Sequence, residues 1–328
     1  MNRMRASFAF LIASLAHAQN LVPNGSFEEY VDCPPSFSFI NWAVGWSGYS
    51  NSVDYFDTCA SSVVDVPLND IGYQYAASGG GYAGVVTYIL GDPFYREILG
   101  CHLTMPLQPG VPVCLRFKVA MGGFGSNPAN SATYTCRGVG MRFLTFDPSM
   151  ESVTNNLLNS NIAALHLDVV PTDTSIWYTV SGTYVPDSAY SVLLIGNFFN
   201  DSLSTPMLFD SVYGTDHFAY VFIDDVRVSY DVGFCDLPDH VSPLEKDRPA
   251  VWPNPFRDFL TITLANTSRN PVSIELFSVD GRSVAHWSVA ATSAISLDTE
   301  ELKPGSYILQ VRNAEGSYPA IHVVRLSP

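Results

Sequence analysis

Apolar and polar residues alternate along much of this chain, which is the pattern of half-buried β-strands. In residues 113–119 the odd positions are Val, Leu, Phe and Val, and the even positions are Cys, Arg and Lys. Three later segments predict strands in the same way: 177–185, 191–198 and 220–230. Gly-, Ser- and Pro-rich turn clusters separate these strands, and only residues 149–167 could hold a short helix. The pattern predicts an all-β fold, namely a sandwich or jelly roll.

A second strand-rich region follows a change of character near Asp231. The segment 236–249 is charged and Pro-rich without an apolar period, which predicts a linker. Beyond it, short strands are expected at 259–264, 273–278, 283–289, 307–311 and 321–326. About 80 residues of short strands favour a small immunoglobulin-like β-sandwich. The predicted division is a leader at 1–18, a jelly-roll β-sandwich at 19–232, a linker at 233–249 and a small sandwich at 250–328.

The first residues predict export from the cell. Arg3 and Arg5 precede a short apolar run over residues 6–15, and Ala16-His17-Ala18 follows as a small-x-small cleavage site. These are the three parts of a secretory signal peptide, so the mature chain is expected to begin at Gln19. The apolar run is too short for a permanent membrane helix. We therefore expect an extracellular protein, secreted or on the outer cell surface, with no transmembrane segment.

The charge of the chain argues against a nucleic-acid partner. The chain has 47% hydrophobic and 14% charged residues, which argues against disorder. Residues 19–249 contain 8 basic and 24 acidic side chains, whereas residues 250–328 contain 6 and 7. So acidic a region repels phosphate backbones, and we expect no nucleic-acid partner.

The six cysteines are expected to form disulfides, because an exported chain folds in an oxidising compartment. No Cys-x-x-Cys pair and no histidine cluster indicates zinc. Cys33 and Cys59 enclose a plausible loop. Cys114 and Cys136 lie on strand-like segments that could face each other across a hairpin. The sequence alone leaves the pairing open.

Three motifs at the end of the chain occur together and in order. They are Trp252-Pro253-Asn254-Pro255-Phe256, then Phe277-Ser278-Val279-Asp280-Gly281-Arg282, then Leu302-Lys303-Pro304-Gly305-Ser306-Tyr307. Residues 250–328 thereby resemble the C-terminal sorting domain of the type IX secretion system of Bacteroidota. That resemblance implies export by the type IX translocon and removal by a sortase that cuts in the linker. It leaves open whether the protein is then released or attached to lipopolysaccharide.

The first domain resembles galactose-binding-like jelly rolls of carbohydrate-binding modules. The resemblance rests on Asn24-Gly25-Ser26-Phe27-Glu28 near its start and on Ile223-Asp224-Asp225-Val226 at its end. In such modules the first and last strands pair and often hold a structural calcium. The resemblance implies Ca²⁺ ligands at Glu28 and Asp225, since calcium prefers oxygen donors. The alternative is that both carboxylates only cap strands or pair with Arg227.

Sugar recognition needs exposed aromatic rings beside amide and carboxylate groups. Aromatic and polar residues crowd the segment between Tyr30 and Tyr95. The candidate ligand-binding residues there are Trp42, Trp46, Tyr49, Asp54, Tyr55, Tyr73 and Gln74. The alternative is that these aromatic residues fill a core under a long loop closed by a disulfide.

No motif indicates catalysis, because GxSxG, HExxH and phosphate-binding glycine loops are all absent from the sequence. Arg96 and Glu97 are interpreted as a structural ion pair. The favoured hypothesis is a non-catalytic, surface-exposed binding protein for a glycan. An adhesive envelope protein with protein partners and an unrecognised polysaccharide hydrolase remain as alternatives.

Overall fold

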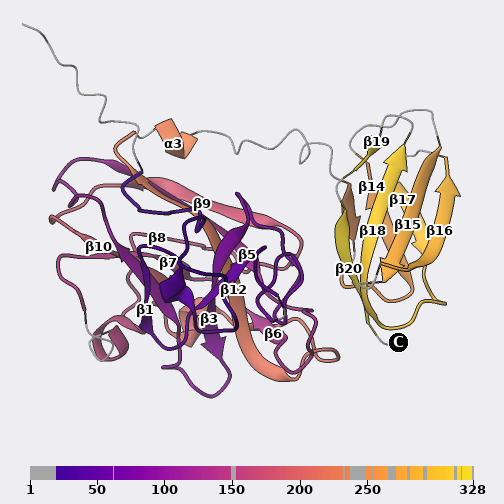
Figure 1. Cartoon of the computed structure of the whole chain (residues 1–328). Coiled ribbons are helices and arrows are strands. Elements are labelled where there is room, and N and C mark those ends of the chain that lie inside the picture. The colour runs from indigo at the N-terminus through magenta and orange to yellow at the C-terminus, as the bar shows by residue number, and fades with distance from the viewer. Residues whose placement is uncertain are drawn as a thin grey trace, which may run out of the picture.

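The computed structural model of the chain contains two β-domains joined by the segment around residues 237–248 (Figure 1). The described residues are 20–61, 63–148, 153–231, 233–236, 249–252, 254–264, 271–278, 281–290, 294–313, 316–318 and 320–326. The predicted signal peptide and most of the predicted linker lie outside these residues. No helix among the described residues is long and apolar enough to cross a membrane.

The first domain is a sandwich of two β-sheets. The five-stranded sheet has the order β1 (Trp46–Ser50), β4 (Ile98–His102), β10 (Val192–Asn197), β7 (Val139–Leu144) and β8 (Leu165–His166). The main path of the seven-stranded sheet is β11 (Met207–Leu208), β6 (Ala132–Thr135), β12 (Asp216–Ser229), β3 (Gly81–Ile89) and β2 (Asp54–Asp57). Two further strands extend that sheet, with β5 (Val113–Met121) pairing with β12 and with β9 (Trp177–Tyr184).

The strands expected from alternation are confirmed at β5, β9, β10 and β12. Their inward side chains form the main core between the sheets, where Phe117, Val119 and Ile223 are fully buried. Of the expected helix over residues 149–167, the described part contains only a five-residue π-turn, η2 (Val153–Leu157). Its apolar side chains pack onto the outside of the five-stranded sheet instead of continuing a helix. Among the described residues, the other short helices are η1 (Ile40–Trp42), α2 (Asp201–Ser204) and α3 (Gly233–Asp236).

A second aromatic core covers the outer face of the seven-stranded sheet. Phe56, Tyr82, Tyr220 and Phe222 are buried there and contact one another edge-on or stacked. Apolar residues of the loop between β2 and β3 complete this core, including Val64, which is fully buried. Because both faces of the sheet are covered, its strands are buried almost throughout, as in β3. This loop also contributes Ile71 to the lining of the candidate site.

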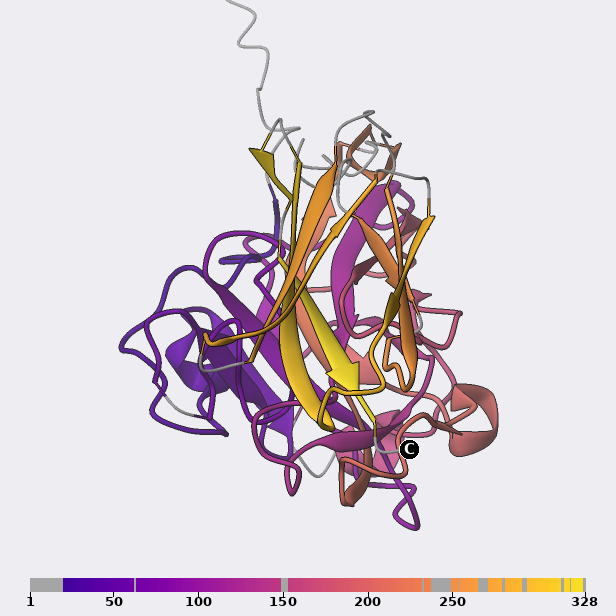
Figure 2. The same ribbon diagram turned by 90° about the vertical axis from the view of Figure 1, so that its right-hand side faces the viewer.

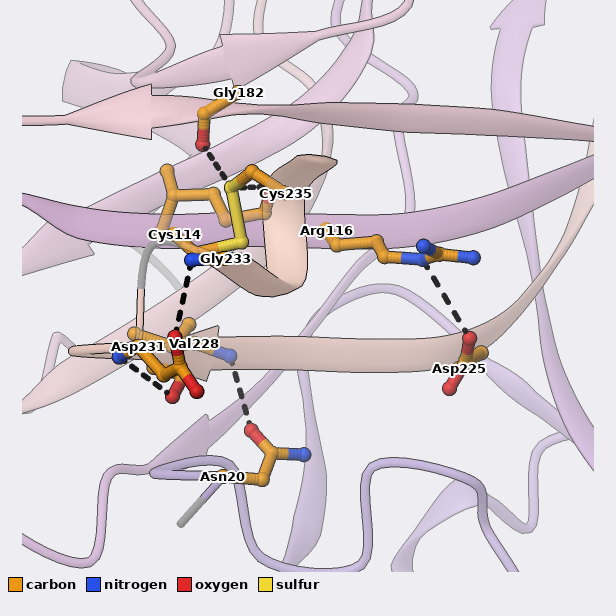
Figure 3. Close-up of a disulfide and its surroundings, with 11 residues drawn as sticks. Asn20, Cys114, Arg116, Gly182, Asp225, Val228, Asp231, Gly233 and Cys235 are labelled. Atoms are coloured by element: carbon orange, nitrogen blue, oxygen red, sulfur yellow. Dashed lines mark hydrogen bonds and ion pairs between the residues drawn. A yellow bond between two sulfur atoms is a disulfide. The ribbon is translucent and has the colours of Figure 1, made fainter. Parts of the chain in front are cut away.

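Two disulfides fasten the first domain. The predicted Cys33–Cys59 bridge is confirmed and closes the loop-rich segment. The expected pairing of Cys114 with Cys136 is wrong, because Cys114 bonds Cys235 of α3 (Figure 3). Cys136 lies just beyond β6, which pairs with β11 and β12 rather than with β5, and its thiol is buried beside Thr87. Cys101 is likewise buried and free.

The second domain is a smaller two-layer sandwich, as expected (Figures 1 and 2). One sheet has three strands: β13 (Ala250–Trp252), β14 (Phe259–Thr263) and β17 (Ala294–Asp298). The other contains β16 (Ser283–Val289), β15 (Val272–Ser278), β18 (Gly305–Asn313), β19 (Gly316–Ser317) and β20 (Ile321–Arg325). Its single core includes Ile262, Ile274, Leu309 and Val323, all fully buried.

Candidate functional site

A cavity of about 210 Å³ opens at one end of the outer aromatic core of the first domain. We call it the acidic pocket. Its lining combines carboxyl, hydroxyl, amide and aromatic side chains with two aliphatic ones. The lining residues are Phe37, Ser52, Asp54, Ile71, Val86, Glu97, Asn130, Asp216, Phe218 and Tyr220. They come from β2, β3, β12 and five loops, so only the folded domain brings them together.

Asp54 begins β2 and is 5% exposed. Its carboxylate accepts hydrogen bonds from the Tyr220 hydroxyl at 2.5 Å and from the Ser38 backbone N–H at 2.7 Å. Gly84 of β3 lies opposite Asp54 in the register. A Cβ at Gly84 would collide with the Tyr220 hydroxyl, so glycine here lets the phenol cross the strand to reach Asp54.

Glu97 precedes β4 and is 3% exposed. Its carboxylate accepts hydrogen bonds from the Val86 N–H at 2.8 Å and from the Ser52 hydroxyl at 3.2 Å. The expected ion pair with Arg96 is wrong, because the fully buried Arg96 pairs with Asp201 of α2. Neighbouring residues of an extended chain point to opposite sides, which sends Glu97 into the pocket and Arg96 away from it.

The two carboxyl groups influence each other's protonation. Burial raises the pKa of Asp54 above its usual value, although its hydrogen bonds partly oppose this. Burial also raises the pKa of Glu97, and the nearby charge of Asp54 raises it further. Among the ion pairs of the described residues, none involves Asp54 or Glu97. A buried acid pair without a cationic partner is costly for folding alone, which is characteristic of functional sites.

Three of the aromatic residues predicted to bind a ligand lie in cores, and this part of the prediction needs correction. Trp46 is 2% exposed, stacks on Phe27 and donates its indole N–H to the Asn24 carbonyl. Tyr55 is fully buried and donates to the Phe27 carbonyl, while Tyr49 packs against η2 and donates to Asp147. A ring enclosed in this way has no free face for a sugar. Trp42 is half-buried and packs on the main core.

Tyr73 and Gln74 do not line the acidic pocket. Tyr73 is half-buried and meets Tyr75 edge-on, with 5.8 Å between ring centroids. Trp177 of β9 donates its indole N–H to the Tyr75 carbonyl. Gln74 is 5% exposed behind these rings. We call Tyr73, Tyr75 and Trp177 the aromatic edge, and Tyr75, with 55% of its surface exposed, is its outermost ring.

The contacts of Glu28 and Asp225 do not fit a calcium site. The Glu28 carboxylate accepts N–H groups of Gly80 and Gly81, and Asp225 pairs with Arg227 at 2.7 Å and faces Arg116 (Figure 3). These partners are hydrogen-bond donors or cations, whereas calcium needs several further oxygen ligands. Within the described ranges, no group of three or more His, Cys, Asp or Glu side chains could hold a metal ion. The alternative pairing of Asp225 with Arg227 is present.

The terminal motifs have structural roles in the second domain. The Asn254 side-chain amide forms two hydrogen bonds with the backbone of β20. It donates to the His322 carbonyl and accepts from the Val324 N–H. Asn254 precedes a cis bond to Pro255, and the next residue, Phe256, is buried in the core. Pro253 lies outside the described residues.

The turn motifs close this domain's hairpins. Gly281 has a φ of 81° and donates to the Ser278 carbonyl, which is the tight turn between β15 and β16. Pro304 precedes Gly305, where β18 begins. Tyr307 is buried and donates its hydroxyl to the Lys303 carbonyl. The motifs are thus the residues that shape this small sandwich.

Residues 250–324 match the family model of the secretion system C-terminal sorting domain. The second domain is a type IX sorting domain. A sorting domain of this kind directs export to the cell surface or the surrounding medium, so the expected localisation is confirmed. The translocation machinery of the type IX system is therefore a partner of this chain.

Other comparisons add little about the first domain. No significant match occurs among curated proteins. A DUF3244 family protein with an immunoglobulin-like β-sandwich fold from Bacteroides vulgatus is 13% identical, with 24% of this chain and 84% of that one covered and a TM-score of 0.20. A β-1,2-glucanase from Parabacteroides distasonis is 13% identical, with 77% and 33% covered and a TM-score of 0.22. Similarities this distant support no activity for this chain.

Proposed function

We propose that the first domain is a non-catalytic module that binds a neutral sugar unit of a glycan in the acidic pocket. The sorting domain delivers it to the cell exterior. The observation that carries the proposal is the pair of buried carboxyl groups, Asp54 and Glu97, which face one open cavity without a cation among the described residues. Such groups accept hydrogen bonds from ligand hydroxyls.

The remaining lining supports a sugar. Phe37 and Phe218 supply apolar faces for ring C–H groups, while Ser52 and Asn130 add hydroxyl and amide partners. Asp216 adds a third acid to the lining. A uronic acid would bring a further negative charge to these acids, so the pocket favours neutral sugars over acidic ones.

Binding measurements on the mature chain test this proposal. A glycan array followed by calorimetry should give binding to neutral oligosaccharides that Asp54→Asn and Glu97→Gln weaken by about 10-fold or more, since one lost charge-assisted hydrogen bond changes the free energy by about 1.5–3 kcal/mol. Asp168→Asn, at an exposed carboxylate that does not line the pocket, is the matched control. Absence of binding on a broad array, or equal loss in the control, would contradict the proposal.

A hydrolase is the second candidate, because a general acid needs a raised pKa of the kind that burial produces at Glu97. Incubating bound oligosaccharides with the mature chain separates the two functions. Recovery of intact ligand supports the binding module. Release of shorter sugars by the wild type but not by Glu97→Gln supports the hydrolase.

A further inference from the structure

One outward position of the sorting domain is buried. In β20 the side chains of Ile321 and Val323 enter the domain's own core, so His322 between them points to the opposite face. The outer face of a small two-layer sandwich normally meets solvent. His322 is nevertheless only 3% exposed. Some other part of the chain must therefore cover this face.

The cover includes the aromatic edge of the first domain. The ring of Tyr73 stacks on the imidazole of His322, with 4.7 Å between centroids and 19° between planes. In Figure 1, β20 lies on the side of the sorting domain that faces the first domain. The two domains therefore meet through a specific ring pair as well as through the linker.

The polar groups of the covered face are incompletely satisfied. Ile308 of β18 lies opposite His322 in the register, and Ser306 lies two residues earlier on the same face. The Ser306 Oγ and His322 Nε2 atoms are both buried without a hydrogen-bond partner. A buried polar group without a hydrogen-bond partner destabilises the arrangement that buries it. The docked arrangement is therefore less stable than it would be with these atoms paired. If the domains separated, Ser306 and His322 could form hydrogen bonds with water.

We propose that the sorting domain docks reversibly on the aromatic edge of the domain it exports, with Tyr73 and His322 as the contact, and caps that edge until it is removed. Stacking of the two rings holds the docked form together. The unpaired polar atoms keep the contact weak enough to separate. Removal of the sorting domain would then expose the face of Tyr73 beside Tyr75, giving the released protein a larger aromatic surface than the full chain has. This inference does not depend on sugar binding in the acidic pocket.

Histidine NMR of the full mature chain tests the docking. His17 leaves with the predicted signal peptide, so six histidines remain, and His322→Gln assigns the signal of interest. Burial lowers the pKa of His322 to about 3, so its ring should not titrate between pH 5 and 8. In Tyr73→Ala, the imidazole of His322 should become accessible and titrate with a pKa near 6.5, the ordinary value for histidine.

Two controls make the result specific. Tyr73→Phe keeps the stacked ring and should keep His322 from titrating. Tyr75→Ala, which removes a neighbouring ring that does not stack on His322, should do the same. If His322 titrates normally in the wild type, or stays silent in Tyr73→Ala, the domains do not dock through this contact and the proposal is overturned.

Discussion

The two domains solve the same folding problem with different means. The first domain contains all six cysteines, two disulfides, a main core, an aromatic core on the outer face of one sheet and several buried acids. The second has no cysteine, has nearly equal numbers of acidic and basic residues, and has a smaller, mainly aliphatic core. A sorting domain that is removed after export needs only a fold that the secretion machinery recognises. A working domain that persists outside the cell benefits from covalent bridges and tolerates costly buried groups at a site.

Reduction of the disulfides should reveal the largest difference in stability between the two domains. Breaking Cys33–Cys59 and Cys114–Cys235 should lower the free energy of unfolding of the first domain by about 2–5 kcal/mol per bridge, because bridges restrict the unfolded chain. The sorting domain should unfold at the same temperature with and without reductant. Calorimetry with and without reductant measures both unfolding transitions. If the transition of the sorting domain shifts together with that of the first domain, the two domains do not differ in this way.

Gly84→Ala should produce a smaller and more local loss. The new methyl group would push the Tyr220 phenol away from Asp54, with a cost of about 1–3 kcal/mol for overpacking. Any ligand binding in the acidic pocket should weaken with it. Gly91→Ala is the control for adding a methyl group, since nothing lies within 4 Å of its Cβ, although its positive φ carries a backbone cost of its own. Unchanged stability in Gly84→Ala would show that the phenol does not need this space.

The pH dependence of stability should also differ. Burial raises the pKa of Asp224 to about 8 from its usual 3.8. The native state therefore holds this proton more tightly than the unfolded state, so the stability of the first domain should fall as pH rises from about 4 to about 8. Asp54 and Glu97 act in the same direction.

Asp224→Asn should flatten that slope, because the amide oxygen can still accept from the Ser78 N–H and carries no proton to lose. Urea unfolding at several pH values measures the effect. The exposed Asp168→Asn should leave the slope unchanged. Equal slopes in Asp224→Asn and wild type would mean that Asp224 does not control this dependence.

Chelation should have the smallest effect. Glu28 and Asp225 already interact with N–H groups and arginines, so EDTA should leave the melting temperatures of both domains unchanged. A fall of the first transition on adding EDTA, reversed by calcium, would restore the predicted calcium site.

Local sequence patterns predicted the strands and the sorting domain well. Alternation marked β5 and β12, and the turn motifs around Gly281 and Pro304 carry their own backbone geometry. These features depend on neighbours in the chain. The same is true of Cys33–Cys59, which closes a short loop.

The site was harder to predict because it depends on distant contacts. Trp46, Tyr55 and Tyr75 have similar side chains, yet only Tyr75 is exposed, and tertiary packing decides between them. Cys114 finds a partner 121 residues away. Asp54 was among the predicted binding residues. That Glu97 lines the same pocket follows only from the tertiary fold, because Asp54 lies on a strand of one sheet and Glu97 precedes a strand of the other. Gly84, a glycine inside a strand, was the overlooked local signal.

The central claim is that residues 250–328 are a separate export address for the domain before them. Its most direct test measures the amounts of the full chain, of a 250–328 deletion and of a reporter fused to the signal peptide and residues 233–328, in periplasm, on the cell surface and in the medium of a type IX-competent host. The deletion should stay in the periplasm while the reporter leaves the cell. A deletion that reaches the exterior as well as the full chain does would contradict the account.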